Sequence, residues 1–456
     1  MGKPHALLLP YPAQGHVIPL MELAHCLVDR GFKITFVNTE FTHKRLVAAA
    51  LSKELEDADQ IHLVTIPDGL GPGEDRNDFV LQIEAMLKFM PGFLETLIED
   101  TNKESENKIT CFIADASIAW SFEVAEKMGV RLGAFWPANA GTLATMLSIP
   151  KLIKEGIIGE DGTAKRREMI KLSPGMPAMS TAHFAWNCFG DSKTEEVVFN
   201  YTVRNNQALE FAEHIICNSI YELEQPVFTY APNILPVGPL LTGQRSGKLI
   251  GHFWPEDATC TTWLDQQPAN SVVYVAFGSF TIFNQRQFQE LADGLEIAGR
   301  PFLWVVRPGL TDGETDALPH GFRDKVEGRG RMVGWCPQQK VLAHPSIACF
   351  ISHCGWNSTM EGVRNGVPFL CWPYFADQFL NQSYISDIWR TGLALAPDDS
   401  GIVSSKEIKA KVEELLANDE FRGRAMALKE MANKSVKKGG SSFENFNSFV
   451  DAMKEF

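Results

Sequence analysis

The chain has 456 residues, of which 45% are apolar and 21% are charged, and this balance is ordinary for a soluble globular protein. The net charge of −14 at pH 7 argues against nucleic acid and against anionic membrane surfaces as partners. The length is enough for about two or three domains.

The cysteines and the first residues indicate the compartment. The nine cysteines include no CxxC pair, which indicates buried thiols in a reducing environment and no zinc site. The first residues lack the apolar core of a secretory signal, and no apolar run reaches the roughly 18 residues of a membrane span. We therefore expect a cytoplasmic protein without a transmembrane helix.

The first half of the chain alternates short apolar runs with helix-like patterns. The expected strands are residues 5–10, 33–38, 61–66 and 109–114, and the expected helices are 15–29, 77–100 with a break near Pro91, and 117–128. This alternation is typical of a parallel, doubly wound sheet. Residues 141–213 are less regular, and their aromatic residues indicate either loop packing or part of a binding pocket.

A second series of strands and helices follows residues 241–262, which are rich in glycine, serine and charge and which we interpret as a linker. Strands are expected at 271–277, 302–306, 331–334 and 347–352, with a helix at 284–298. Near the end, apolar residues recur at helical spacing (Phe443, Phe446, Val450 and Met453), which predicts a last helix within 438–456.

The most informative segment runs from Trp335 to Gln378. The strand at 347–352 leads through the tight turn beginning with His353 into a helix whose first turn contains Asn357. Such a helix start presents unpaired backbone N–H groups, which suit an anion. An indole at one end and a carboxylate with an amide, Asp377 and Gln378, at the other suit a flat base and a polyhydroxylated group. The pattern therefore favours a nucleotide sugar.

This segment closely resembles the signature box of the plant family 1 UDP-dependent glycosyltransferases, and the likeness extends over all 44 of its positions. The matching positions include Trp335, Pro337, Gln338, His344, the run from His353 to Ser358, Glu361, Gly366 to Pro368, Pro373, Asp377 and Gln378. The resemblance implies the GT-B fold, an α/β architecture of two facing Rossmann-like domains with parallel sheets and a cleft between them.

The domains expected from this resemblance divide the chain into four parts. Residues 1–240 form an acceptor domain, 241–262 the linker, 263–437 a UDP-sugar domain, and 438–456 a helix that packs back on the first domain. In sheets of this kind, ligands bind outside the carboxyl ends of the strands.

His16 and Asp115 are the candidate catalytic residues. Both follow strands of the first domain, so both can reach the carboxyl edge of its sheet. A histidine accepts a proton near neutral pH, and a carboxylate on its other nitrogen holds the ring in place. The resemblance assigns His16 as the base and Asp115 as its acidic partner. It implies an inverting displacement, in which an acceptor hydroxyl attacks the anomeric carbon as UDP leaves.

The resemblance also assigns the donor site. The residues expected to hold UDP are Ser279, Trp335, Gln338, His353, Asn357, Ser358 and Glu361, and those expected to hold the sugar are Trp356, Asp377 and Gln378. Gln378 is similar to the glutamine of glucose-using members. Hydrogen-bond donors hold the phosphates and no acidic DxD motif lies near the box, so we expect UDP-glucose as co-substrate, no metal ion and no cofactor.

The acceptor is less defined. Pocket candidates are Phe89, His183, Phe184, Trp186 and Phe375, which suit a flat or apolar molecule such as a flavonoid, another phenolic, a terpenoid or a hormone of plant secondary metabolism. We expect a monomer.

One position departs from the family pattern. Many members carry threonine or serine after a Phe-Trp pair to hold the sugar, but here Pro137 follows that pair. Asn139 or Thr142 would have to substitute for the missing hydroxyl, or the contact would be absent.

A dehydrogenase is disfavoured, because the first turn contains no GxGxxG pattern. Two alternatives stay open. The first is transfer to carbon, since a deprotonated phenol is also nucleophilic at carbon. The second is a non-catalytic nucleotide-sugar binder, which would keep the box but would need no base at His16.

Overall fold

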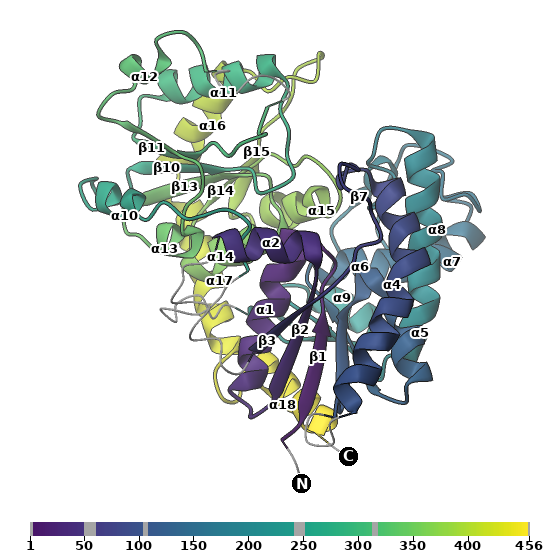
Figure 1. The fold of residues 1–456 in the computed structure, drawn as a ribbon. Coiled ribbons are helices and arrows are strands. Elements are labelled where there is room, and N and C mark those ends of the chain that lie inside the picture. The colour runs from purple at the N-terminus through teal and green to yellow at the C-terminus, as the bar shows by residue number, and fades with distance from the viewer. Residues whose placement is uncertain (1–2, 50–60, 104–107, 241–250, 312–317, 455–456) are drawn as a thin grey trace. The chain divides into compact units, whose positions relative to one another are not determined.

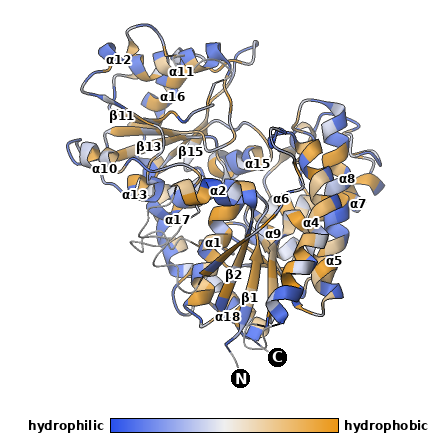
Figure 2. Ribbon diagram, viewed as in Figure 1, coloured by the Kyte–Doolittle hydropathy of each residue, from blue (hydrophilic) through white to orange (hydrophobic). Residues whose placement is uncertain are grey.

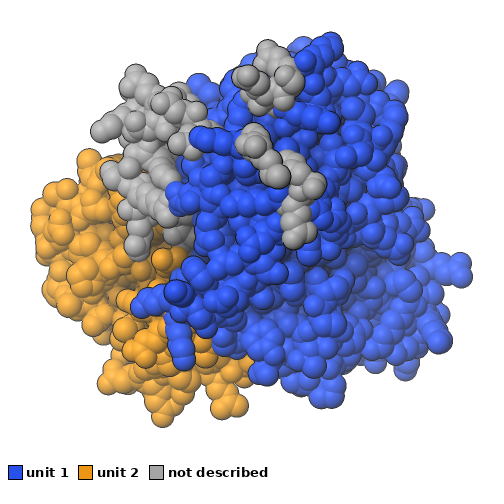
Figure 3. Space-filling model, turned by 90° about the horizontal axis from the view of Figure 1, so that it is seen from below, with its two compact units in different colours: residues 1–253, 375–377, 434–456 blue, residues 254–374, 378–433 orange. Residues whose placement is uncertain are grey.

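The computed structural model describes residues 3–49, 61–103, 108–240, 251–311 and 318–454. By their contacts these residues form two units (Figure 3). Unit 1 contains Met1–Phe253, Phe375–Asp377 and Lys434–Phe456, and unit 2 contains Trp254–Tyr374 and Gln378–Asn433. The predicted linker begins in residues 241–250, which lie outside the described residues, and the predicted domain bounds stay a prediction.

Unit 1 is built on a parallel sheet of seven strands (Figure 1). The strands are β1 (His5–Leu9), β2 (Lys33–Thr39), β3 (Ile61–Ile66), β4 (Cys111–Asp115), β5 (Arg131–Trp136), β8 (His214–Cys217) and β9 (Ile234–Pro236). Their order across the sheet is β3-β2-β1-β4-β5-β8-β9. The chain winds from β1 out to β3 and then returns to β4 beside β1, so the winding direction reverses between β1 and β4. The predicted doubly wound sheet is confirmed.

The strands of this sheet are apolar for a physical reason. Every residue of β1 and β4 is buried, as expected for a parallel sheet that is covered on both faces. Figure 2 shows the same division, with strands mainly hydrophobic and helices hydrophobic on one side only. The α-helices of unit 1 are α1 (Gln14–Val28), α2 (Glu40–Ala49), α4 (Phe79–Asn102), α5 (Trp120–Lys127), α6 (Ala140–Leu147), α7 (Ile149–Lys154), α8 (Ser192–Ala208), α9 (Gln225–Tyr230) and α18 (Ser441–Lys454).

Shorter elements complete unit 1. The 3-10 turns are η2 (Ala116–Ile118), η3 (Thr181–His183) and η4 (Leu209–Phe211), and β6 (Met169–Ile170) pairs antiparallel with β7 (Met179–Ser180). The last helix, α18, belongs to this unit. Its Phe449 is fully buried and lies against Gly133 of β5, where an added Cβ would be 3.0 Å from the ring.

The expected break near Pro91 is wrong, because α4 continues through this proline. A proline in a helix interior removes one hydrogen bond and crowds the preceding turn, which costs about 3 kcal/mol. The apolar face of α4 is buried along its length, from Ile83 through Met90 to Ile98. Burial of this face outweighs the local cost, because each fully buried apolar side chain contributes about 1.5–3 kcal/mol.

Unit 2 is built on a second parallel sheet, with six strands. They are β10 (Val272–Ala276), β11 (Phe302–Val305), β12 (Gly330–Val333), β13 (Ile347–Ser352), β14 (Phe369–Cys371) and β15 (Gly392–Ala394). The order is β12-β11-β10-β13-β14-β15, so here the winding reverses between β10 and β13. The α-helices are α10 (Thr259–Leu264), α11 (Gln285–Ala298), α12 (Phe322–Lys325), α13 (Gln338–Leu342), α14 (Trp356–Asn365), α15 (Gln378–Ser383), α16 (Ser405–Ala417) and α17 (Asp419–Ser435). The last two residues of α17 group with unit 1, and a π-helical turn η5 (Tyr384–Ile388) follows α15.

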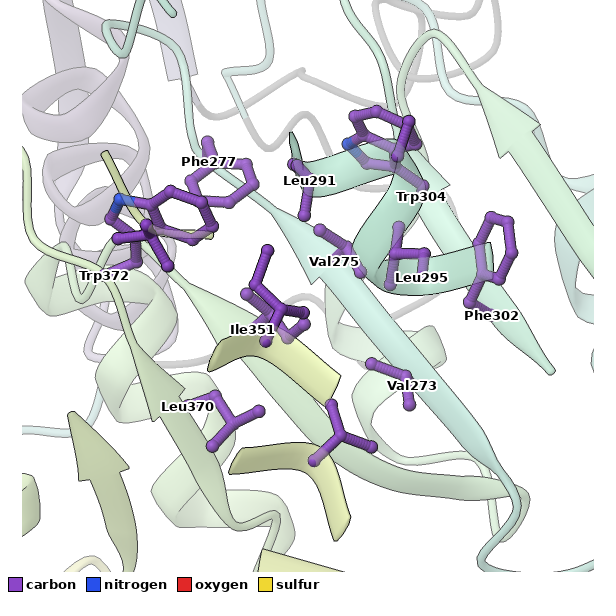
Figure 4. Close-up of a cluster of buried hydrophobic side chains, with 14 of the residues drawn as sticks. Val273, Val275, Phe277, Leu291, Leu295, Phe302, Trp304, Ile351, Leu370 and Trp372 are labelled. Atoms are coloured by element: carbon purple, nitrogen blue, oxygen red, sulfur yellow. The ribbon is translucent and has the colours of Figure 1, made fainter. Parts of the chain in front are cut away.

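The core of unit 2 lies between its sheet and the helices α11 and α16. Val273 and Val275 of β10 and Ile351 of β13 are almost completely buried among large aromatic rings (Figure 4). Trp304 is among the largest fully buried side chains. This packing fixes the strands whose carboxyl ends carry the candidate donor site. Over the described ranges, no helix has both the length and the apolar character needed to cross a membrane.

Candidate functional site

The candidate base lies where the winding of the first sheet reverses. His16 is in the first turn of α1, directly after β1, and Asp115 is the last residue of β4. Nδ1 of His16 is 2.6 Å from Oδ2 of Asp115. The other carboxylate oxygen, Oδ1, accepts a hydrogen bond from the backbone N–H of Ser117 at 2.8 Å. Both oxygens are therefore fixed, which leaves Nε2 of His16 as the nitrogen that can accept a proton.

The surroundings of His16 favour its protonated form. The Asp115 side chain is fully buried, whereas the His16 side chain keeps 28% of its surface exposed. Burial lowers the pKa of His16, but the charge and hydrogen bond of Asp115 together with the charge of Asp377 outweigh burial, so that the pKa is raised. An imidazolium that forms here is stabilised by these carboxylates.

Tyr11 packs against the His16 ring, and the sequence did not reveal it. The two ring centroids are 5.1 Å apart. The Tyr11 hydroxyl donates to Oε1 of Gln82 on α4 at 2.9 Å. Burial, with the charge of Asp115, raises the pKa of Tyr11 far above its usual range. The phenol therefore stays protonated and acts as a fixed donor.

The second candidate site lies at the reversal point of the other sheet. His353 follows β13, and the turn beginning with Gly278 follows the neighbouring strand β10. The His353 ring packs closely against two glycines, because an added Cβ on Gly278 or Gly355 would be 2.6 Å or 2.4 Å from Nε2. Gly278 also has a φ of 64°, which favours glycine. These two glycines are required by the position of the histidine.

The turn from His353 into α14 is strained and leads directly into a helix start. Cys354 has a φ of 63°, which is uncommon for a residue with a side chain. Its carbonyl accepts hydrogen bonds from Nδ2 of Asn381 at 2.8 Å and from the Thr359 hydroxyl at 3.3 Å, and these contacts hold the turn. The N-cap of α14 is Gly355, and no side-chain cap bonds to its first turn. The backbone N–H groups at this helix start can therefore face a ligand.

His353 is electrically unlike His16. Burial lowers its pKa to about 4, a backbone hydrogen bond with Ala276 opposes this, and the charge of Arg307 lowers the pKa further. His353 is therefore neutral at physiological pH and carries one N–H and one acceptor nitrogen.

Four polar side chains form one network at the start of α13 and α14. Nε2 of Gln338 donates to Oγ of Ser358 at 2.8 Å and to Oε2 of Glu361 at 2.6 Å. The hydroxyl of Tyr274 donates to Oε1 of Gln338 at 2.8 Å. The structure thus brings together three residues that were expected to hold UDP. Tyr274 was missed, although a hydroxyl within the apolar strand β10 is a signal that could have identified it.

Trp335, the expected platform for a base, already has an aromatic neighbour. Trp254 stacks on it with ring centroids 4.9 Å apart and planes at 25°. The backbone N–H of Asp257 donates to the carbonyl of Trp335 at 2.9 Å, so the segment carrying Trp254 is attached to the platform. An indole held on one side can present its other face to a flat base. Nothing in the sequence signalled Trp254, which lies far from Trp335 in the chain.

The residues expected to hold the sugar differ in their surroundings. Trp356 is 3% exposed and packs against Trp389 at 6.3 Å. Oε1 of Gln378 accepts from the backbone N–H of Tyr374 at 2.7 Å, so this amide also closes the turn before α15. Asp377 groups with unit 1, whereas Trp356 and Gln378 belong to unit 2.

The segment that carries Asp377 is held by a thiol of the same unit. The backbone N–H of Ala376 donates to Sγ of Cys188 at 3.3 Å. Ala376 has a φ of 55°, a second strained position beside an expected site residue. The remaining predicted donor residues, Ser279 and Asn357, are both half-buried.

Asn139 and Thr142, the two candidates for replacing the hydroxyl that is missing at Pro137, are both part of the N-terminal cap of α6. Oδ1 of Asn139 accepts from the backbone N–H of Thr142 at 2.6 Å, and the Asn139 carbonyl accepts from Nε1 of Trp136 at 2.7 Å. Asn139 is fully buried, and Thr142 is 7% exposed. The backbone N–H groups that follow Asn139 donate to the buried carboxylate of Glu224 at 2.9 and 3.0 Å. Asn139 and Glu224 therefore cap α6 from within.

The five expected acceptor residues do not share one kind of environment. Phe184 and Trp186 are buried and stack on each other at 4.7 Å, with Phe199 beside Trp186 at 5.8 Å. Their rings stabilise the irregular region, which agrees with the loop-packing interpretation. Phe89 and His183 are exposed and Phe375 is half-buried, so these three are the residues that a ligand could contact.

Within the described ranges, no three side chains of histidine, cysteine, aspartate or glutamate are grouped so that they could hold a metal ion. The described cysteines are all free thiols.

Comparison with known proteins gives a consistent result. A family model described as UDP-glucoronosyl and UDP-glucosyl transferase matches residues 181–437. UDP-glycosyltransferase 83A1 of Arabidopsis thaliana is 44% identical over 463 residues, covering 100% of this chain and 97% of the relative. The (R)-mandelonitrile beta-glucosyltransferase of Prunus dulcis is 33% identical and covers 99% of this chain and 97% of its own length.

Solved structures share the fold. Phytolacca americana UGT2, complexed with UDP-2fluoro-glucose and pterostilbene, has a TM-score of 0.80 at 27% identity, with 99% of each chain covered. Two doubly wound parallel sheets in one chain, together with this likeness, confirm the expected GT-B fold class.

Proposed function

Since the chain belongs to the family of UDP-glucoronosyl and UDP-glucosyl transferases, we propose that it transfers glucose from UDP-glucose to a hydroxyl group of a small apolar or aromatic molecule. Family membership places it among plant UDP-glycosyltransferases that act on small molecules. The observation that carries the catalytic part is the 2.6 Å contact between Nδ1 of His16 and the buried carboxylate of Asp115.

His16 acts as the general base in this proposal. Nδ1 is hydrogen-bonded to Asp115, so Nε2 is the nitrogen that accepts a proton. It takes the proton of the acceptor hydroxyl while the hydroxyl oxygen attacks the anomeric carbon. The bond from that carbon to the diphosphate breaks in the same step, and the configuration inverts. Asp115 stays ionised and stabilises the imidazolium.

The leaving UDP gains negative charge, and we propose that neutral donors stabilise it. These are His353, the backbone N–H groups at the start of α14, and Ser279, with Asn357 and Ser358 beside them. Donors fixed before the reaction stabilise developing charge without rearrangement. In this arrangement the diphosphate needs no metal ion, so turnover should persist in EDTA.

The nucleoside and sugar assignments rest on the network in unit 2. The platform of Trp335 would stack on uracil, and Glu361 with Gln338 would receive the ribose hydroxyls. Asp377 and Gln378 would bind the hydroxyls of glucose. The preference for glucose is supported by relatives that are named glucosyltransferases and by the neighbour bound to UDP-2fluoro-glucose.

The acceptor proposal is the broadest. Phe89, His183 and Phe375 suit a flat or apolar molecule, such as a phenolic or terpenoid of plant secondary metabolism. We further propose that the enzyme acts as a monomer in the cytoplasm, which suits its free thiols. A panel of such acceptors with UDP-glucose, read by mass and by stability of the product to acid, would separate transfer to oxygen from transfer to carbon.

Replacement of the base tests the mechanism. The wild-type chain should release UDP from UDP-glucose only when an acceptor is added. His16→Ala should reduce that rate by about 10²–10⁴-fold, the usual contribution of a general base, without weakening UDP binding. His62→Ala, which removes an exposed histidine from β3 of the same sheet, is the matched control and should keep full activity. Full activity of His16→Ala would refute the proposed mechanism.

A further inference from the structure

A buried cation lies at the carboxyl edge of the second sheet. Arg307 follows β11 by one residue and is only 6% exposed. Arginine is almost never buried this deeply without a structural or functional reason, since removing its charge from water is costly. Its position is at the edge where β10 and β13 end in the candidate phosphate site.

The guanidinium of Arg307 binds backbone carbonyls. Its Nε donates to the carbonyl of Gly278 at 2.9 Å, and Nη2 donates to that of Thr281 at 2.5 Å. Nη1 donates to the carbonyl of Pro308 at 3.1 Å. The planar fork therefore ties the loop after β11 to the turn 278–281 after β10.

This turn contains Ser279 and supports His353. Gly278, whose carbonyl Arg307 holds, is also the residue whose added Cβ would be 2.6 Å from Nε2 of His353. A movement of the turn would therefore change the positions of Ser279 and His353 together. Both are residues that the proposed function assigns to the diphosphate.

We propose that Arg307 is a positioning residue for the diphosphate of the nucleotide sugar, acting through the turn 278–281 and through its own positive charge. The proposal rests on the proposed function, which places a diphosphate at Ser279 and His353. Carbonyl oxygens that face Arg307 cannot point toward an anion, so the turn can present donors instead. The positive charge of Arg307 matters as well. The net charge of the chain is −14, which disfavours the binding of an anion such as the diphosphate.

The charge of Arg307 also acts on His353. Together with burial, the Arg307 charge lowers the pKa of that histidine. The same field that disfavours a proton on His353 favours a phosphate beside it.

Binding measurements with purified full-length protein test the proposal. The probes are UDP, which carries the diphosphate, and uridine, which lacks it. Arg307→Lys keeps the charge but loses the fork, and Arg307→Met keeps the apolar stem only. Both should weaken UDP binding by about tenfold or more, the range for hydrogen bonds that involve a charge. Uridine binding should change by less than about twofold.

Arg422→Lys is the matched control. Nη2 of Arg422 donates to the carbonyls of Ile347 and Ala348 at 3.3 and 2.5 Å, at the amino end of β13 and thus at the opposite edge of the same sheet. This variant should bind both probes as the wild type does. Equal losses for UDP and uridine in the Arg307 variants, or no loss for UDP, would overturn the proposal. A wild-type chain that does not bind UDP would instead overturn the proposed function on which it rests.

A measurement on the wild type keeps the test valid if the variants fail to fold. UDP should slow amide hydrogen exchange in the turn 278–281, and uridine should slow it much less. Unchanged exchange in this turn upon UDP binding would overturn the role of Arg307.

Discussion

The two places where the sheets reverse their winding are alike in topology and opposite in charge. Each has a histidine just beyond a strand end, His16 after β1 and His353 after β13. His16 lies against the carboxylate of Asp115, and its pKa is raised although burial acts in the other direction. His353 lies between two glycines near Arg307, and burial lowers its pKa to about 4. The same residue type therefore has opposite preferences for a proton at the two reversal points, after the first strand of the pair in unit 1 and after the second strand of the pair in unit 2.

This difference shows that topology provides the position, while burial and neighbouring charges provide the chemistry. Beside a carboxylate, an imidazole can take up a proton and keep it during a reaction. Buried near a cation, it stays neutral, with one nitrogen that donates a hydrogen bond and one that accepts. The first site is suited to accepting a proton, and the second is suited to holding an anion.

Removing the carboxylate should have the largest effect. Asp115→Asn would leave His16 without its negative partner, so that the imidazolium is no longer stabilised. We expect turnover at saturating UDP-glucose and acceptor to fall by about 10²–10⁴-fold, the range attributed to positioned acid–base groups. Calorimetric UDP affinity should stay within about twofold of wild type, given that the nucleotide residues lie in unit 2. An Asp115→Asn enzyme with near-normal turnover would contradict the comparison.

The pH profile should separate the two histidines. The base must be neutral to accept a proton, so kcat/KM should fall as the pH drops through the pKa of His16. Because that pKa is raised, the acid limb should lie above the ordinary histidine value of about 6.5. In Asp115→Asn the limb should move to lower pH. His353, with a pKa of about 4, should add no limb between pH 5 and 9, and a limb that persists in His16→Ala would contradict this.

A glycine-to-alanine substitution, which adds one methyl group, should have a large effect beside His353 and a small effect beside His16. In Gly355→Ala the new Cβ would be 2.4 Å from Nε2 of His353, so the ring must move. Overpacking of this kind costs about 1–3 kcal/mol, and we expect UDP to bind about 5- to 150-fold more weakly. Gly15, beside His16, has no heavy atom within 4 Å of an added Cβ.

The matched control for that experiment is therefore Gly15→Ala. It should keep its UDP affinity, and its melting temperature should be equal or higher, since alanine is favoured over glycine within a helix. Calorimetric titration and thermal unfolding check both variants. Wild-type UDP affinity in Gly355→Ala would show that His353 is not confined as described.

The smallest expected effect concerns the aromatic platform. Trp254→Ala would remove the ring that stacks on Trp335. An aromatic pair contributes about 0.5–1.5 kcal/mol, so UDP binding should weaken by about 2- to 12-fold. Trp254→Phe should restore most of the loss, and binding of inorganic diphosphate should be unaffected. An equal loss of affinity for inorganic diphosphate would mean that Trp254 stabilises the whole unit and does not act on the binding of uracil in particular.

Much of the fold could be predicted because its cause is local. Buried parallel strands are short apolar runs, and such runs are visible in the sequence at β1, β4, β10 and β13. The closeness of His16 and Asp115 also followed from topology, because neighbouring strand ends meet at one edge. Pro91 was misjudged since its local cost is outweighed by burial along α4, which no local pattern expresses.

The parts of the site that could not be predicted depend on contacts between distant segments. Trp254 meets Trp335 across many intervening residues, and Tyr11 meets Gln82 through the packing of α4. Phe184 and Trp186 resembled pocket residues by type, but only the structure reveals that their rings are buried. Arg307 can be noticed in the sequence as a single cation just after an apolar strand. Its role could not be predicted, because it depends on the backbone carbonyls that surround the guanidinium in the structure.

The division of the chain into units has a consequence for how the protein is made. Unit 1 includes residues 434–456, which follow unit 2 in the chain and are therefore synthesised after it. Until they emerge, the surface of β5 around Gly133 lacks Phe449, which fills it in the complete protein. A nascent chain thus exposes an apolar face that invites aggregation. Removal of α18 would therefore disturb the unit that contains His16, although more than 400 residues separate the two in the chain.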